Sequence, residues 1–224
     1  MNKKMFKAVP VLVGGLVFGA TLTACGSSDG VDSVEAQTGT QLQELLLTAE
    51  ESGLDGATET NDTVLEGETI PLVVVSEAEK FDGACGEALQ AAEAAELNTV
   101  ASAARTLDRG DGDTGVAIAQ FSVADSDISP AQLYADIAEA CTDPIKDDET
   151  GAEYSFTPLG SDVDGFIFDI KVTPGNESSS VMMLEDLGNH HILVAGMDAD
   201  EDTTRQVFDA QVKKTRDGLT SAGE

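Results

Sequence analysis

Two adjacent histidines, His190 and His191, are the only imidazole groups in this chain of 224 residues. The sequence around them predicts a β-strand, and neighbouring residues of a strand point to opposite faces of the sheet. The two rings therefore cannot easily bind one metal ion, and zinc would need further ligands that the sequence does not offer. We expect one histidine at the surface and the other in the core, with no metal bound.

Acidic residues at positions 198–202 resemble the start of a calcium loop. An EF-hand loop would place glycine where Thr203 stands and glutamate where Asp209 stands, so both positions depart from the pattern. Acidic residues are also expected at the N-terminus of a helix, because they interact favourably with its dipole. We assign no metal ligand here, nor in the acidic turn at 108–113.

Signatures of catalysis are missing from the sequence. It has no glycine-rich phosphate loop and no Gly-x-Ser-x-Gly elbow, and with two histidines a hydrolytic triad has no visible members. Forty-two acidic side chains make carboxylate pairs inevitable, so none of them indicates a glycosidase. We predict no catalytic residue and no cofactor, which means that the protein is not an enzyme.

The first 24 residues have the character of an export signal. Lys3, Lys4 and Lys7 precede an apolar run that ends at Ala24. The run is about 17 residues long, and a membrane-spanning helix needs roughly 20. We therefore predict a signal peptide over residues 1–24.

The residues at the end of this signal, Leu22-Thr23-Ala24-Cys25, resemble a bacterial lipobox. The resemblance implies cleavage before Cys25 and a diacylglyceryl thioether on its sulfur, with acyl chains such as palmitate in the cell membrane. Two chains are the minimum for stable anchoring. The protein is then a lipoprotein on the extracytoplasmic face. The alternative is a plain secretory signal followed by an incidental cysteine.

The body behind the signal is strongly acidic. Without Lys3, Lys4 and Lys7 it has nine basic and 42 acidic side chains, a formal charge of −33. This charge argues against nucleic acid and against anionic lipid headgroups as partners. An apolar content of 41% is too high for a wholly disordered chain.

Two cysteines remain in the body, Cys85 and Cys141, each on the apolar side of a predicted helix. An exported location favours their oxidation. A disulfide across a loop of this length contributes about 4 kcal/mol in the chain-entropy model. The alternative is a pair of buried free thiols.

The order of the elements predicts one domain. Residues 25–40 are expected to be the lipidated cysteine and a flexible tether, and residues 41–224 an α+β domain. Helices are predicted from Thr48 to Gly53, from Ala84 to Leu97, from Ser129 to Asp143 and from Asp202 to Asp217. Strands are predicted at 63–75, 99–107, 116–123, 154–159, 163–172, 179–187 and 190–197.

Consecutive hairpins in this order imply an antiparallel sheet, with helices mainly on one face. Along residues 116–123, Val116, Ile118 and Gln120 share one face. Ala117, Ala119 and Phe121 do not alternate cleanly with polar residues. We therefore expect this strand to be buried on much of both faces.

The body resembles small actinobacterial envelope domains, among them lipoproteins and the extracellular sensor domain of a mycobacterial serine/threonine kinase. The resemblance lies in the spacing of the leucine run at 45–47, Cys85, the hairpin at 107–123, the helix that ends at Cys141, and the last helix. Members often have a second disulfide and tryptophans, and this chain has neither. The resemblance implies a non-enzymatic ligand-binding or sensing domain.

These features together predict a lipid-anchored envelope lipoprotein that binds an unknown ligand or envelope protein outside the membrane. The alternative is a carrier of an apolar envelope molecule. Its cavity would lie between sheet and helices, lined by the strands of Phe166, Phe168, Met182 and Met183.

Overall fold

A computed structural model describes residues 34–110, 115–124, 127–172 and 175–222. The signal peptide, Cys25 and most of the expected tether lie outside the described residues. The helices are α1 Gly39–Leu45, α2 Gly83–Ala94, α3 Pro130–Ala140 and α4 Glu201–Ala222, with a 3-10 turn, η1, at Ala78–Lys80. The strands are β1 Thr58–Glu66, β2 Thr69–Pro71, β3 Glu96–Asp108, β4 Gly115–Val123, β5 Ile145–Asp147, β6 Ala152–Pro158, β7 Asp164–Val172, β8 Asn176–Leu187 and β9 His190–Met197.

The strands form one antiparallel, nine-stranded sheet in the order β1-β3-β4-β9-β8-β7-β6-β5, with β2 paired to the start of β3. This arrangement confirms the predicted α+β class and the single sheet. The predicted strand at residues 190–197 and the helix start at Ser129-Pro130 also agree with the structure, because Ser129 accepts a hydrogen bond from the backbone N–H of Gln132.

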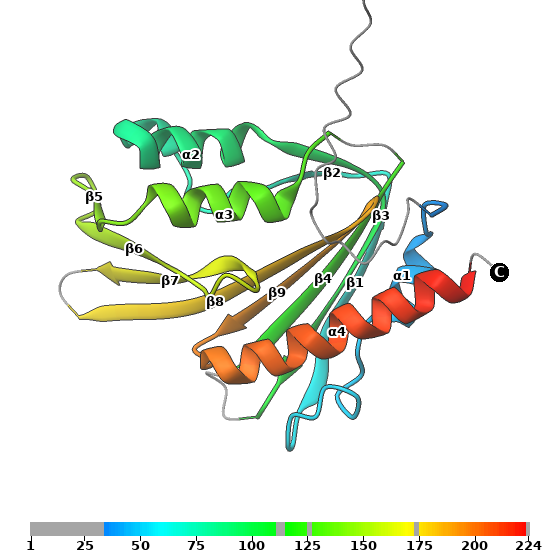
Figure 1. The fold of residues 1–224 in the computed structure, drawn as a ribbon. Helices are drawn as coiled ribbons and strands as arrows, with labels where there is room; N and C mark the ends of the chain where they lie inside the picture. The colour runs from blue at the N-terminus through cyan, green and yellow to red at the C-terminus, as the bar shows by residue number, and fades with distance from the viewer. Residues whose placement is uncertain (1–33, 111–114, 125–126, 173–174, 223–224) are drawn as a thin grey trace, which may run out of the picture.

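The helices divide between the two faces of the sheet, although we expected them mainly on one. In β8, Val181 and Met183 face α1 and α4, whereas Met182 and Leu184 face α3. Helices α1 and α4 therefore cover one face, and α3 covers the other face over β6, β7 and β8, with α2 packed beside it (Figure 1). The reason is that β8 is apolar on both sides and needs cover on both.

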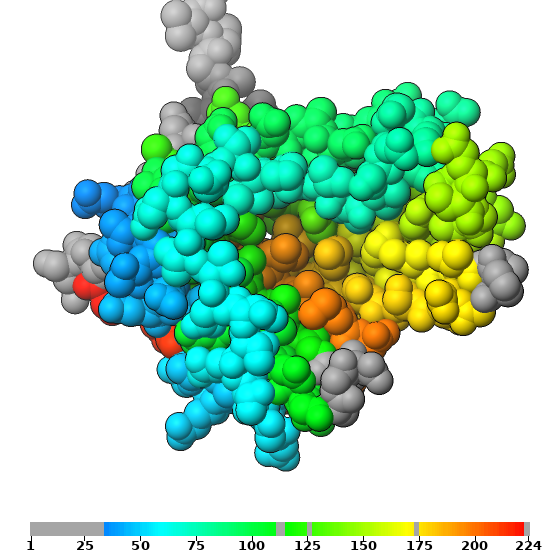
Figure 2. Space-filling view, turned by 180° about the vertical axis from the view of Figure 1, so that it is seen from behind, coloured from blue at the N-terminus to red at the C-terminus, as the bar shows by residue number. Residues whose placement is uncertain are grey.

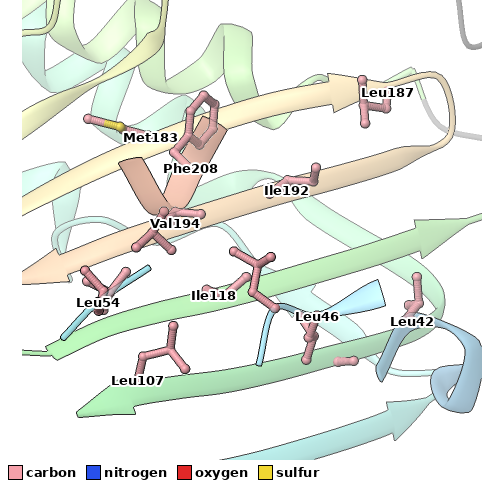
Figure 3. Close-up of a cluster of buried hydrophobic side chains, with 14 of the residues drawn as sticks. Leu42, Leu46, Leu54, Leu107, Ile118, Met183, Leu187, Ile192, Val194 and Phe208 are labelled. Carbon is pink, nitrogen blue, oxygen red and sulfur yellow. The ribbon is translucent and has the colours of Figure 1, made fainter. Parts of the chain in front are cut away.

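The first core lies between the sheet and the pair α1–α4 (Figure 3). Val207, Phe208 and Leu219 of α4 are buried there against strand residues such as Ile118 and Val194. Gly218 lets the two helices come close, because a Cβ at this position would collide with the side chain of Leu45.

The second core lies between α3 and the sheet and is filled with aromatic rings. Phe166 stacks on Tyr134 with centroids 5.3 Å apart, and Phe156 and Phe168 pack against each other at 5.0 Å. Met183 belongs to the other core. The space in which a carrier cavity was expected is therefore occupied by side chains.

The N-terminal part of the body differs from prediction. The first helix is α1, capped by Thr38 with Gln41 in a capping box, so residues expected in the tether are already folded. Thr48 and Glu51 do form the expected reciprocal hydrogen bonds, but around a turn. The backbone of the leucines before this turn bonds to a side chain of α4: Gln211 donates to the carbonyl of Leu45 and accepts from the N–H of Leu47.

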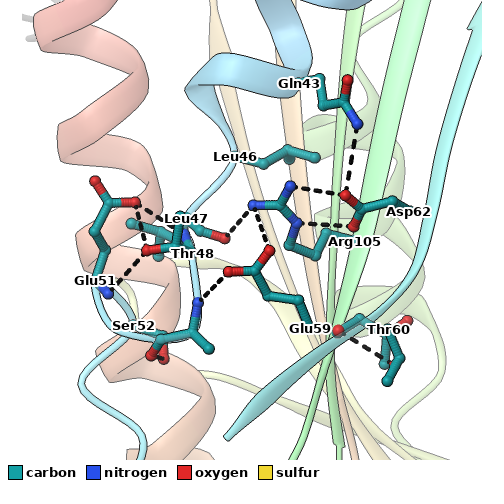
Figure 4. Close-up of polar contacts among 12 residues, drawn as sticks. Gln43, Leu46, Leu47, Thr48, Glu51, Ser52, Glu59, Thr60, Asp62 and Arg105 are labelled. Atoms are coloured by element: carbon teal, nitrogen blue, oxygen red, sulfur yellow. Dashed lines mark hydrogen bonds and ion pairs between the residues drawn. The ribbon is translucent and has the colours of Figure 1, made fainter.

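Arg105 fixes the same segment to the sheet (Figure 4). Its guanidinium donates two hydrogen bonds of 2.8 Å to Asp62 and one of 3.1 Å to the carbonyl of Leu47. These bonds hold the pKa of Asp62 below its usual value. Every bond of this set joins parts of the fold, so we regard the Arg105 cluster as structural.

The predicted disulfide is confirmed. Cys85 in α2 and Cys141, which caps the end of α3, are bonded with their Cα atoms 4.6 Å apart. The bond ties α2 to α3, and α3 in turn packs on the sheet.

Candidate binding site

One half of the sheet is left without a helix on one of its faces in the described part of the chain. Helix α3 covers this face only over β6, β7 and β8, and α2 packs on α3 and β2. The uncovered positions follow from the strand register. We name this surface the open face, which consists of Thr60, Thr63, Leu65, Ser102, Ala104, Thr106, Ala117, Ala119, Phe121, Met182, His191, Leu193 and Ala195. Met182 packs against the core beneath α3, and His191 is joined to the start of α3 through Asp186, so these two residues mark its boundary.

The open face forms three rows across the sheet. The first is Leu65–Ser102–Phe121–His191, the second Thr63–Ala104–Ala119–Leu193, and the third Thr60–Thr106–Ala117–Ala195–Met182. Most of these residues are half-buried, although they lie on central strands, and Leu65 is 40% exposed. Small side chains at the central positions of these rows leave the surface recessed, and we call this recessed surface the floor of the open face.

The open face carries no acidic, lysine or arginine side chain. This is unusual for a body of charge −33, in which exposed positions are commonly Asp or Glu. Figure 2 shows that the surface is hollowed here, between the teal α2 and β2 region and the green, orange and yellow strands β4, β9 and β8. An uncharged, concave and partly apolar surface is suited to binding apolar groups.

A partly buried polar cluster lies at one end of the open face. His191 Nδ1 lies 2.7 Å from Asp186 Oδ1, and the hydroxyl of Ser129 donates to Asp186 Oδ2 at 2.5 Å. His191 is only 4% exposed, and its Nε2 has no hydrogen-bond partner among the described residues. Because Ser129 bonds to the carboxylate and not to the imidazole, the cluster is not arranged as a nucleophile with its base.

His190 points to the opposite face, as adjacent strand residues must. We expected one histidine at the surface, but both are buried, because α1 and α4 cover His190 and the start of α3 lies against His191. His190 Nε2 lies 3.2 Å from Ser122 Oγ, which also accepts a hydrogen bond from the backbone N–H of Gln37. Ser122 is 0% exposed, so this serine–histidine contact is closed to substrates. Burial, and then the neighbouring His191, lower the pKa of His190 to about 4.

Acidic residues lie on the same side of the sheet just beyond the open face. The register places Asp186 opposite His191 and Asp108 after Thr106. Asp164, opposite Leu184, lies farther away in the part of the sheet that α3 covers, where it lines a pocket with Ala135 and Ala138. Desolvation, and then the charge of Asp186, raise the pKa of Asp164. The border of the open face is therefore negative although its floor is neutral.

The acidic cluster at 198–202 has a structural role. Asp200 accepts hydrogen bonds from the N–H and hydroxyl of Thr203 at the start of α4, and these bonds lower its pKa. Asp198 accepts a bond from the N–H of Ser179. Within the described ranges no three His, Cys, Asp or Glu side chains are placed to hold a metal ion. Part of the acidic turn at 108–113 lies outside them.

Three surface pockets, of about 300, 440 and 280 Å³, are lined by no residue of the open face, although Asp164 lines the first and Ser129 the third. None is lined by Phe166, Phe168, Met182 or Met183, the residues expected around a carrier cavity. No described helix is both long and apolar enough to cross a membrane.

The open face was not predicted from the sequence. We expected Ala117, Ala119 and Phe121 to be buried on the second side of their strand, whereas they are half-exposed. The signal was present in the sequence: uncharged residues occupy alternate positions of several strands in a very acidic chain.

Comparison with known proteins adds two structural neighbours. The sequence matches no protein-family model, and no curated protein matches it. The extracellular domain of PknH from Mycobacterium tuberculosis superposes with a TM-score of 0.46 at 11% identity, covering 83% of this chain and 100% of that one. An uncharacterised Rv0999 ortholog from Mycobacterium smegmatis gives 0.48 at 14% identity, covering 81% and 98%. The first is a domain of the kind that the spacing of the sequence resembles.

Proposed function

We propose that this protein is a lipid-anchored lipoprotein of the cell envelope whose extracytoplasmic body binds a ligand or partner, without catalysis, on the open face. The observation that carries the proposal is the charge-free, hollowed floor in a body that is acidic elsewhere. Keeping acidic residues off an exposed surface removes the desolvation cost that an apolar ligand would otherwise meet there.

Two further features support this role. The predicted export signal and the lipobox-like sequence at Cys25 support a location outside the membrane, in which the Cys85–Cys141 bond would be stable. That bond fixes α2, which borders the hollow and packs on α3 and β2. A site with a fixed border loses less conformational entropy on binding.

The test uses the lipid-free body, residues 26–224, and Nile red, an uncharged dye whose emission shifts in apolar surroundings. We expect saturable binding that Ala119→Gln weakens, because the longer side chain fills the floor between Ala104 and Leu193. Thr220→Gln, an exposed change on α4 at the opposite face, is the control. Binding that is equal in both variants would place the dye elsewhere and contradict the proposal.

A further inference from the structure

We infer that the partner of the open face is a basic segment of another protein, extended along the strands, with apolar side chains toward the floor and lysine or arginine at its margins. This inference rests on the proposed function and adds the chemical class of the partner.

The charges around the open face carry the inference. Asp108 and Asp186 lie at its border on the same side of the sheet. Each described strand that contains a lysine or arginine presents it on the other side: Arg105 lies on the face of Leu107, and Lys146 and Lys171 alternate with residues of the second core. On the strands themselves, a partner with cationic margins would thus meet only acidic side chains at this border, and Arg109 follows Asp108 in the adjoining turn.

The shape of the floor also favours an extended segment as the partner. The rows run across four and five strands, with alanine and threonine at most of their central positions. Such a floor accommodates an extended segment whose alternate side chains point down, because strand residues alternate between two sides. A fully apolar partner would leave the acidic border without compensation.

Two other occupants are disfavoured by charge. A second copy of this protein would bring another body of −33 against the first, and the two would repel each other. An anionic lipid surface would be repelled in the same way.

The experiment compares three cyclic β-hairpin peptides that share one valine face and carry lysine, serine or glutamate on the other. Binding to the lipid-free body is measured by fluorescence anisotropy at low and moderate salt. We expect the lysine hairpin to bind about tenfold more tightly than the serine hairpin, which corresponds to roughly 1.4 kcal/mol. The glutamate hairpin should not bind, and salt should remove most of the lysine advantage.

Matched variants distinguish the effect of the border residues on peptide binding from the effect of the overall charge. Asp108→Asn should reduce the preference for lysine. Asp209→Asn, at an exposed acid of α4 on the opposite side, removes the same charge and should leave the preference intact. An equal loss in both variants would mean that net charge alone attracts the peptide, and would overturn the inference.

The two proposals fail in different ways. If Nile red binds in an Ala119-dependent manner but the lysine hairpin binds no better than serine, the basic partner is wrong and the binding face stands. If neither probe depends on Ala119, both proposals are wrong. Concentration-dependent dimerisation that Ala119→Gln abolishes would identify a second copy as the occupant and would also overturn the basic segment.

Discussion

The carboxylate of Asp186 lies 2.7 Å from Nδ1 of His191, across the β8–β9 ladder. The same carboxylate accepts the hydroxyl hydrogen of Ser129, the residue that caps α3. One side chain therefore connects the floor of the open face with the helix that covers the neighbouring strands.

Removing that carboxylate should destabilise the body. Asp186→Ala leaves two largely buried polar groups, on His191 and Ser129, without this partner, which costs about 1–3 kcal/mol in unfolding free energy. Asp186→Asn keeps an acceptor oxygen and should cost clearly less. Urea denaturation of the two variants measures the difference, and equal losses would contradict the bridging role.

Stability should fall between pH 6.5 and pH 4 through His190. Its pKa of about 4 in the folded body, against 6.5 when exposed, means that the unfolded chain binds the proton more strongly in this window. The contribution reaches about 3 kcal/mol below pH 4, at 1.36 kcal/mol per pH unit.

The variant His190→Gln isolates this effect. It removes the titrating group, so its unfolding free energy should decline less than that of the wild type from pH 6.5 to pH 4. Parallel declines in wild type and variant would show that other groups, such as the many carboxylates, control acid sensitivity.

Loss of the disulfide should loosen α2 first. Cys85→Ser with Cys141→Ser should lower the unfolding free energy by about 2–4 kcal/mol. Hydrogen exchange should rise in α2 more than in β4 and β9, because α2 reaches the sheet through α3 and β2. Uniform acceleration across the sheet would contradict this local role.

Salt should stabilise the body, because a charge of −33 repels itself at low ionic strength. We expect the unfolding temperature of residues 26–224 to rise from low to moderate sodium chloride. Calcium chloride at equal ionic strength should add little. A saturable rise at sub-millimolar calcium would instead indicate a site, first at Asp198, Asp200 and Asp202.

The predicted lipid anchor on Cys25 can be tested separately. Cys25→Ser should release the body from membranes or block processing, because the thioether requires the cysteine sulfur. Detergent-phase partitioning of the full chain in cells checks this. Cys85→Ser is the control, since Cys85 is bonded to Cys141 in the body. Unchanged partitioning of the Cys25 variant would show that no lipid is attached there.

Local sequence signals predicted a helix or strand correctly where its formation depends on no tertiary contact. Ser129-Pro130 predicts the start of α3, since an N-cap and a proline at the first helical position need no tertiary contact. The apolar run from His190 to Met197, which follows a Gly-Asn turn, predicts β9 in the same way.

Tertiary contacts decided the features that the sequence did not predict. Residues 48–53 contain the capping residues of a helix start. However, Gln211, Lys214 and Arg105 form hydrogen bonds with the backbone of the adjacent leucines and hold the segment in an irregular, non-helical conformation. The open face depends on where α3 ends over the sheet. An uncharged strand side is compatible with burial or with a binding surface, and pattern alone does not separate these.

The entry of the chain into the body determines which end of the sheet would lie nearest to a lipid anchor. Gln37 donates its backbone N–H to Ser122, one residue from the end of β4. A flexible chain of a dozen residues reaches about 20 Å, so a lipid on Cys25, as proposed, would keep this end of the sheet near the bilayer. At about 3.3 Å per residue, the opposite end of β4 lies roughly 25 Å away along the strand. Neighbours tethered to the same membrane would then be the partners that reach the open face most readily.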